Sequence, residues 1–398
     1  MRLSTAHAFD ASIESLVQRQ ARLSQSQLQL TTGRAVNRAS DDPAAAARAE
    51  RALASEARSR SMQRAVEASR SAMSVAESTL GDAGELMQQA RELMVAAGNA
   101  TLGDAGRASI GERLRDLRAQ LLMLANQGNS AQGFVFAGQG VSEAPFLDAA
   151  TGVQFTGTEG ASVGDSGEPL ALSLDGNAVW LRAQSGNGVF ETTATLSNGS
   201  AWIDAGQVSD PQALTGSSYD IVFDVTAGVT TYAVLQGGAP TAVTAAAFTP
   251  GQQIVVDGQA VRIAGQPADG DRFGLAPATP DLDIFSVLDA AASALQTPAQ
   301  PAARVAQSVA FGLRDIDAAM AGIGSARAQA GALLARIDAV SGRLQDTELH
   351  AHTARSAAQD LDMVRAISDF QNQQTGYEAA LKSHAMLRQQ SLLQYLNF

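Results

Sequence analysis

Apolar side chains recur at alternating steps of three and four residues at both ends of this 398-residue chain. That spacing is typical of a helix with one apolar seam, as in a coiled coil. A lone helix of this kind is marginal in water, because ordering each residue costs about 1–2 kcal/mol of backbone entropy. Both ends therefore need partners. The predicted assembly seam consists of Ile13, Leu16, Gln20, Leu23, Gln27 and Leu30 near the N-terminus and of Met363, Ile367, Phe370, Gln374, Tyr377, Leu381, Leu392 and Tyr395 near the C-terminus.

Glutamine at several of these positions weakens the pairing within one molecule. A buried leucine contributes about 1.5–3 kcal/mol, and a buried amide without a partner gives up part of that gain. We therefore expect termini that become ordered when copies assemble, the first partner of each helix being the other terminus. The same periodicity also fits ordinary amphipathic helices that close a soluble domain, and periodicity alone does not separate the two interpretations.

Charge divides the chain into three regions of different composition. Residues 1–140 carry 16 basic and 14 acidic side chains, residues 141–275 carry 3 and 14, and residues 276–398 carry 9 and 12. Almost all of the net charge of -12 therefore lies in the middle region. The ends and the middle are predicted to be different kinds of structure.

The outer regions have the patterns of long helices. Pro43 follows two aspartates and opens an alanine-rich run, which is the arrangement of a helix N-terminus. We expect helices over about 43–98 and 104–128, a further helix from near 281 to 295, and a long one over about 302–358. The apolar row of the first of these consists of Val66, Met73, Leu80, Met87 and Met94.

The middle region has the pattern of short antiparallel strands, with segments such as 218–225, 230–235 and 253–257 bounded by Gly, Asn, Asp and Pro. The predicted fold class is α+β: a long helical bundle or coiled coil from the two chain ends, with an inserted antiparallel β domain. We expect a terminal coiled-coil domain (1–40 and 360–398), a helical bundle domain (41–140 and 280–359) and a β-rich outer domain (141–279).

Composition disfavours several classes of partner and compartment. A pI near 4.8 and the lack of a basic patch disfavour nucleic acid. No apolar run approaches the ~18 residues of a membrane span, and we expect no cleaved signal peptide. The absence of cysteine excludes disulfides and thiolate metal sites.

Motifs that could carry chemistry are better explained as structure. Residues 164–169 resemble a protease nucleophile loop, but the histidine base would have to be His7, in the predicted coiled coil. His350 and His352 are two residues apart, so on a helix they point in opposite directions. The acidic pairs at 269–271 and 281–283 lack a full set of calcium ligands. We expect no enzyme activity, no metal and no cofactor.

Several segments resemble one family. Residues 30–48 resemble the flagellin-type N-terminal motif, in the version that is typical of the flagellar hook-filament junction family, the third hook-associated proteins. The family motif residues are Asn37, Arg38, Asp41, Asp42 and Pro43. Residues 133–146, 251–273 and 377–396 are also similar to segments of hook-associated proteins. The resemblance is specific at both ends and loose from 147 to 250.

This resemblance implies a structural protein that is exported unfolded by the flagellar type III route. It implies a ring of copies that joins hook to filament, with the neighbouring hook-associated protein, flagellin and an export chaperone at the C-terminal helix as partners. The expected location is extracellular, at the hook-filament junction. Flagellin itself remains the structural alternative, although its chain would be expected to end soon after a Ser-Leu-Leu segment. A secreted adhesin or surface enzyme would require a binding cluster in 141–275, where Trp180, Trp202 and Tyr219 are the candidates.

Overall fold

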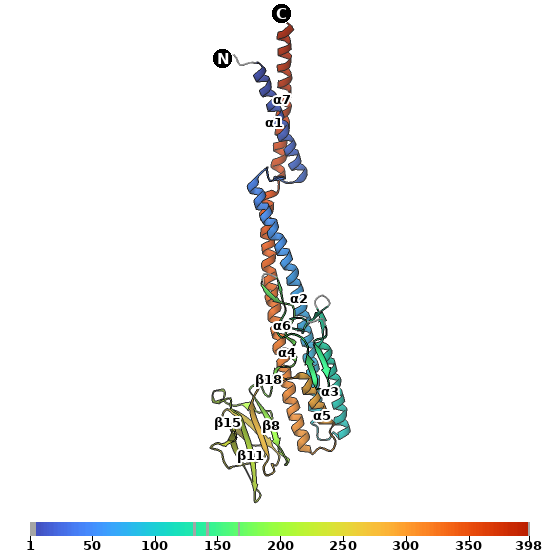
Figure 1. Cartoon of the computed structure of the whole chain (residues 1–398), viewed down its shortest axis with the longest axis vertical. Coiled ribbons are helices and arrows are strands. Elements are labelled where there is room, and N and C mark those ends of the chain that lie inside the picture. The colour runs from blue at the N-terminus through green and yellow to red at the C-terminus, as the bar shows by residue number, and fades with distance from the viewer. Residues whose placement is uncertain (1–4, 130–132, 141–142, 166–167, 397–398) are drawn as a thin grey trace. The chain divides into compact units, whose positions relative to one another are not determined.

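A computed structural model describes residues 5–129, 133–140, 143–165 and 168–396. Long helices form both ends of the chain and short strands form the middle (Figure 1), so the predicted α+β class is confirmed. The helices are α1 (Thr5–Thr32), α2 (Pro43–Ala97), α3 (Asp104–Ala125), α4 (Gly176–Trp180), α5 (Ile284–Gln296), α6 (Ala302–Gln359) and α7 (Met363–Leu396), with a 3-10 turn at Pro211–Ala213.

The strands lie between α3 and α5, and most are short. They are β1 (Gly128–Asn129), β2 (Gly133–Phe134), β3 (Phe146–Ala149), β4 (Gly152–Phe155), β5 (Val163–Asp165), β6 (Pro169–Ala171), β7 (Ala183–Gln184), β8 (Phe190–Leu196), β9 (Trp202–Ile203), β10 (Gln207–Val208), β11 (Tyr219–Thr226), β12 (Val229–Gln236), β13 (Ala239–Pro240), β14 (Ala246–Ala247), β15 (Gln253–Val256), β16 (Gln259–Ala264), β17 (Arg272–Pro277) and β18 (Pro280–Leu282).

The chain divides into two compact units. The terminal unit contains residues 1–63 and 341–398, and the central unit contains residues 64–340. Helices α2 and α6 each contribute to both units. The predicted division into three domains, with boundaries near residues 40, 140, 280 and 360, stays a prediction.

The start of α2 gives the acidic pair of the family motif a structural role. Asp42 accepts hydrogen bonds from the backbone N–H groups of Ala44 and Ala45, both at 2.9 Å, and so caps the helix. Asp41 accepts from the backbone N–H groups of Asn37 and Arg38, at 3.1 and 2.9 Å, and so closes the loop before it. The motif therefore fixes where α2 begins.

The connection from α1 to α2 pairs with the connection from α6 to α7. Ala35 donates its backbone N–H to the carbonyl of Gln359 at 2.8 Å, and Leu361 donates to the carbonyl of Gly33 at 3.0 Å. Gly33 has a φ of +69°, in the left-handed region that favours glycine. These bonds join the two ends of the chain where each turns into its terminal helix.

In the central unit, α2, α3, α5 and α6 share one hydrophobic core. All five side chains of the predicted α2 row, from Val66 to Met94, have no exposed surface. The predicted apolar face of α5 is also buried. Phe146, Val153 and Trp180 belong to this same core, so the segment from β3 to α4 packs on the helices.

An alanine in place of Gly111 is expected to destabilise the central unit, because α3 and α5 approach closely there. A Cβ atom at Gly111 would lie 3.0 Å from the carbonyl oxygen of Ala292 and 2.9 Å from Cγ of Gln296. We expect Gly111→Ala to lower the free energy of unfolding by about 1–3 kcal/mol in urea denaturation followed by circular dichroism. Gly84→Ala is the matched control, since nothing lies within 4 Å of its Cβ position. It should raise stability by up to about 1 kcal/mol, and equal gains for both variants would contradict this account.

Arg118 of α3 fixes the β3–β4 hairpin to the helices. Its guanidinium makes two hydrogen bonds to Asp148 of β3, at 2.7 and 2.8 Å, and one to Asp289 of α5, at 2.6 Å. The hydrogen bond from Arg118 lowers the pKa of Asp148. At the start of α5, burial has the opposite effect and raises the pKa of Asp283.

The lowered pKa of Asp148 predicts a pH-dependent stabilisation by this pair. A carboxyl whose folded pKa lies below its unfolded value of about 3.9 stabilises the fold above that pH, and the contribution is lost as pH falls through the folded pKa. We expect Asp148→Asn to melt at a lower temperature than the parent protein near about pH 6, and the gap to narrow towards about pH 3. The comparison cancels the opposing effect of Asp283, which both proteins retain. A gap that is independent of pH would contradict the role of the ion pair.

Strands β8 to β17 form a β sandwich with its own core, while β1–β2, β5–β6 and β7–β18 are separate two-stranded pairs. One sheet has the order β13-β12-β11-β17-β8, with β14 also on β12, and the other has the order β10-β16-β15, with β9 on β16. The expected strands at 218–225, 230–235 and 253–257 correspond to β11, β12 and β15. Phe190, Phe223 and Phe273 lie in the sandwich core together with Tyr219.

Two side chains of α6, Gln307 and Arg314, form hydrogen bonds with the sandwich. Its entry and exit strands are neighbours, because Phe190 of β8 pairs with Pro277 of β17. On α6, the side-chain amide of Gln307 pairs with the backbone of Ile203, accepting from its N–H at 2.9 Å and donating to its carbonyl at 3.0 Å. Arg314 of α6 donates to the carbonyl of Thr192 in β8. Hydrogen bonds therefore hold the insertion against α6.

Candidate assembly surface

Polar side chains contribute to the contact between the two terminal helices. Ser12 on α1 is hydrogen-bonded to Nδ1 of His384 on α7 at 3.0 Å, and Ser26 donates to Gln373 at 2.9 Å. Gly376 of α7 also faces α1, since a Cβ atom at this position would lie 3.1 Å from the guanidinium of Arg19. This contact face leaves much of the apolar surface of both helices uncovered.

The structure divides the predicted seam into two groups. Leu16, Leu23, Leu30, Phe370 and Tyr377 are half-buried. Ile13, Gln20, Gln27, Met363, Ile367, Gln374 and Leu381 are exposed, and Leu392 and Tyr395 lie outside the described side chains. One molecule thus covers part of the seam, and the assembly role of the seam residues stays a prediction.

Val364 and Met386 of α7 are exposed as well, but most of the uncovered apolar residues form what we call the outer stripe: Ile13, Val17 and Leu28 of α1, and Met363, Ile367 and Leu381 of α7. On each helix these residues lie on one side of the face that contacts the other helix. Because the helices are antiparallel, the two rows fall on the same flank of the pair. Val17 and Leu28 were not predicted, although Val17 follows Ile13 by four residues, the step that would have identified it.

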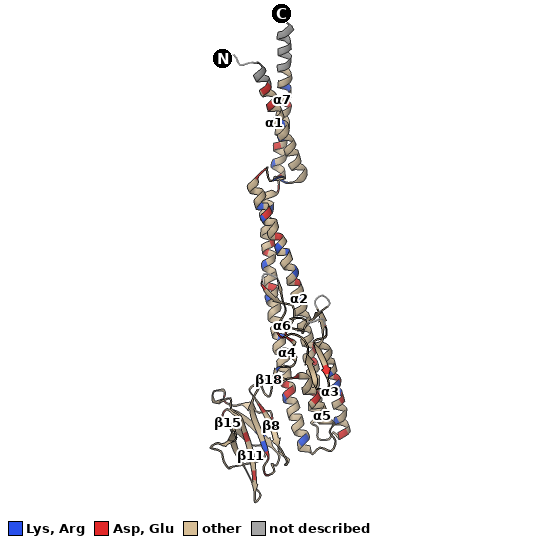
Figure 2. Ribbon diagram, in the orientation of Figure 1, with Lys and Arg blue, Asp and Glu red and all other residues tan. Residues whose placement is uncertain are grey.

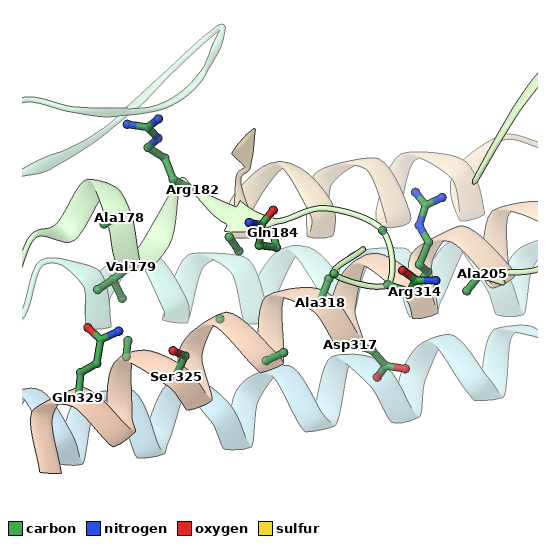
Figure 3. Close-up of a pocket in the computed structure, with 17 residues that line it drawn as sticks. Ala178, Val179, Arg182, Gln184, Ala205, Arg314, Asp317, Ala318, Ser325 and Gln329 are labelled. Atoms are coloured by element: carbon green, nitrogen blue, oxygen red, sulfur yellow. The ribbon is translucent and has the colours of Figure 1, made fainter. Parts of the chain in front are cut away.

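A groove over α6 is the strongest candidate for a small-molecule site, with a volume of about 600 Å³. Small residues of α6, such as Ala318, Ala321 and Gly322, line one side, and the segment 178–188 lines the other (Figure 3). Two of its three charged groups have structural partners, since Arg314 bonds to β8 and Asp317 pairs with Arg91 of α2 at 2.7 Å, whereas Arg182 is exposed and contacts only the carbonyl of Pro280, at 3.5 Å, among the described residues. These contacts give the groove no converging catalytic groups.

The motifs considered for chemistry have structural roles where they are described. Asp271 is buried and accepts from the backbone N–H groups of Asn198, Gly199 and Ala268, at 2.7, 3.1 and 2.8 Å, so it fixes a loop. Asp283 caps α5 by accepting from the N–H of Phe285 at 2.8 Å. Ser166 of the protease-like segment, and the side chain of His7, lie outside the described part of the chain.

Metal and membrane sites receive no support from the residues that the structure describes. Within them, no three His, Asp or Glu side chains are placed to hold a metal ion. Over the same ranges, no helix combines the length and apolar character needed to cross a bilayer. The aromatic candidates lie in cores or against them: Trp180 and Tyr219 are buried, and Trp202 is half-buried in β9.

Comparison with known proteins relates these features to one family. Models of the N-terminal and C-terminal helical regions of bacterial flagellin match residues 4–140 and 313–396. Flagellar hook-associated protein 3 of Salmonella typhimurium is 32% identical over 191 residues, which cover 45% of this chain and 59% of that protein. The chain thus matches little more than half the length of this curated relative.

Solved structures extend the similarity to the fold. The crystal structure of FlgL from Xanthomonas campestris has 26% identity and a TM-score of 0.65, and the match covers 72% of this chain and 94% of that one. The flagellar junction protein FlgL from Legionella pneumophila has 25% identity and a TM-score of 0.63, with 70% and 95% covered. The two flagellin helical regions together match more than half of the chain, which therefore belongs to the bacterial flagellin family, as a flagellin-like protein of the hook-filament junction type.

Proposed function

We propose that this chain is a structural component of the bacterial flagellum, an adaptor ring that joins hook to filament through helix packing between copies. The observation that carries the proposal is the outer stripe. Exposed apolar residues such as Ile13, Ile367 and Leu381 follow one flank of a helix pair that is joined in part by polar contacts. Covering such a stripe releases about 25 cal/mol for each Å² of apolar surface removed from water, and neighbouring copies would provide the cover.

The proposed partners are further copies of this chain, the neighbouring hook-associated protein and flagellin. An export chaperone at the C-terminal helix is part of the same proposal, since α7 carries exposed apolar residues that need protection before assembly. The proposed location is extracellular, at the junction between hook and filament. The resemblance to proteins named for the hook and the junction supports this location over a place along the filament.

Removal of the gene from the source bacterium tests the proposal. We expect cells with intact hooks that carry no filaments and that release flagellin into the medium, because the filament has no adaptor on which to start. An epitope-tagged copy that restores motility should be found at the filament base by immunogold microscopy. Label along the whole filament would indicate flagellin instead, and intact filaments in the deletion strain would contradict the proposal.

A further inference from the structure

A groove between α2 and α6 lies in the terminal unit. Its volume is about 450 Å³, and its floor contains the buried alanines Ala52 and Ala351. Arg48, Arg51 and His350 are exposed and form its rim. Such a recess, with a small apolar floor and a cationic rim, suits an aliphatic side chain that has a carboxylate beside it.

The rim arginines have charge available for a partner. Nε of Arg48 donates to the carbonyl of Ala44 at 3.4 Å, and Nε of Arg51 donates to the carbonyl of Ala47 at 3.1 Å. These are main-chain groups of the same helix, and among the described residues neither arginine has a carboxylate partner. Figure 2 shows basic and acidic residues interspersed along α2 and α6, so charge of both signs is available for contacts between copies.

The opposite flank of the same helix pair carries two exposed leucines. Leu53 is 44% exposed and Leu349 is 64% exposed. Around the axis of α2, Leu53 lies about 100° to one side of the floor residue Ala52. Ser55, which lines the groove, lies on the other side of Ala52, so Leu53 and the groove are on opposite flanks. Glu50 precedes Leu53 by three residues, is exposed, and has no ion-pair partner in the described ranges.

We propose that Leu53 and Leu349 of one copy dock into the α2–α6 groove of a second copy, with Glu50 beside the rim arginines. This inference rests on the proposed function and specifies a lateral contact of the ring. Because the two surfaces lie on opposite flanks, a copy that has filled one neighbour's groove still offers its own. A contact of this head-to-tail kind produces a ring when its rotation closes and a helical series when it does not.

The groove and the two exposed leucines lie at the same position along the axis of the helix pair, which fits a side-by-side arrangement of copies. The groove is lined by residues 48–55 of α2 and 347–354 of α6. The two leucines fall inside these same stretches, one on each helix. Copies joined by this contact would therefore lie beside one another with little axial offset, as the members of a flat ring do.

Cysteine cross-linking tests this contact directly, because the natural chain contains no cysteine. We expect Leu53→Cys with Ser55→Cys in one chain to give a ladder of covalent multimers when isolated flagella are treated with a short bis-maleimide. The two cysteines of one chain point away from each other, so the ladder reports contacts between copies. Each single variant should give no ladder, since a cysteine on one flank meets no cysteine on the next copy.

The matched control is Ala54→Cys with Ser55→Cys, because Ala54 is exposed and points away from α6. A ladder as strong in this control as in the test variant, or no ladder in flagella that contain the chain, would overturn the contact and leave the proposed function standing. Failure of the natural chain to appear in the flagellar fraction would instead contradict the proposed function.

A charge substitution gives a second measurement. Leu53→Arg places a third cation beside Arg48 and Arg51 of the next copy, and we expect about tenfold less of the variant in the flagellar fraction. Ser61→Arg adds the same charge on the outward side of α2, about three turns beyond Glu50, and should be incorporated like the natural chain. Equal incorporation of both arginine variants would overturn the proposed contact, and circular dichroism of each purified monomer establishes that it is folded.

Discussion

Leu381→Asp abolishes incorporation of the chain into flagella while the monomer keeps its fold; this is the result we expect from the outer stripe. Leu381 is 43% exposed in the single molecule, so its change to aspartate costs the monomer less than the change of a fully buried leucine would. In an assembly that covers the stripe, the same change removes about 1 kcal/mol of the apolar burial gained on assembly and places a carboxylate in a dry contact, which is the larger cost. The loss recurs at every copy, so assembly should fail completely.

The matched control for this variant is Val364→Asp on the same helix. Val364 is 83% exposed and lies outside the outer stripe, so this variant should be incorporated. Immunoblots of isolated flagella measure incorporation, and circular dichroism of the purified monomers measures helix content. Normal motility with Leu381→Asp would refute the assembly role of the stripe, as would equal loss of incorporation in both variants.

The terminal helices show what periodicity can and cannot predict. The step of three and four residues identified α1 and α7 as helices with apolar faces. It did not indicate how many partners share a face, and so Leu23 is half-buried while Ile367 of the same predicted seam is exposed. A spacing fixes which residues lie on one side of a helix, whereas their burial depends on contacts across the sequence.

In the rest of the fold, local sequence signals predicted where helices begin, but they gave no information on contacts between residues that are far apart in the sequence. The capping aspartates before Pro43 indicated where α2 begins, and the proline-rich break near residues 298–301 indicated where α6 begins. By contrast, Phe146 and Trp180 pack in the helical core, although both belong to the acidic middle region that was predicted to form a β-rich domain. Composition reports the average of a region, whereas these aromatic side chains share one core with residues of α2, α3 and α5 and both contact Phe285 of α5.

Arg314 was not among the residues singled out from the sequence, because two of its partners are far away in the chain. It is 7% exposed, and its guanidinium bonds to Glu191 at 3.1 Å and Asp315 at 2.7 Å as well as to the carbonyl of Thr192. The guanidinium carbon also lies 4.5 Å from the centre of the Phe311 ring. Glu191 and Thr192 are more than 120 residues away in the chain, so no local pattern connects them to α6.

Arg314→Met is therefore expected to loosen the β sandwich from α6. The change leaves two partly buried carboxylates and a carbonyl without their cation, and breaking a buried pair of this kind costs about 3–5 kcal/mol. The carboxylates keep some contact with water, so we expect the lower end, about 3 kcal/mol, in urea denaturation of the purified protein. Hydrogen exchange should rise at β8 and β9, where α6 contacts the sandwich, before it rises in α3 and α5.

Arg304→Met provides the matched comparison for this variant. Arg304 is exposed on the same helix, and it makes no ion pair within the described part of the chain. Its loss should change stability by less than about 0.5 kcal/mol. Arg314→Lys separates charge from geometry, because one ammonium cannot bond to Glu191, Asp315 and Thr192 in the arrangement of the guanidinium, so only part of the stability should return. Equal stability of the Arg304 and Arg314 variants would show that Arg314 does not hold the sandwich, and the attachment would then depend on the Gln307 pairing with β9.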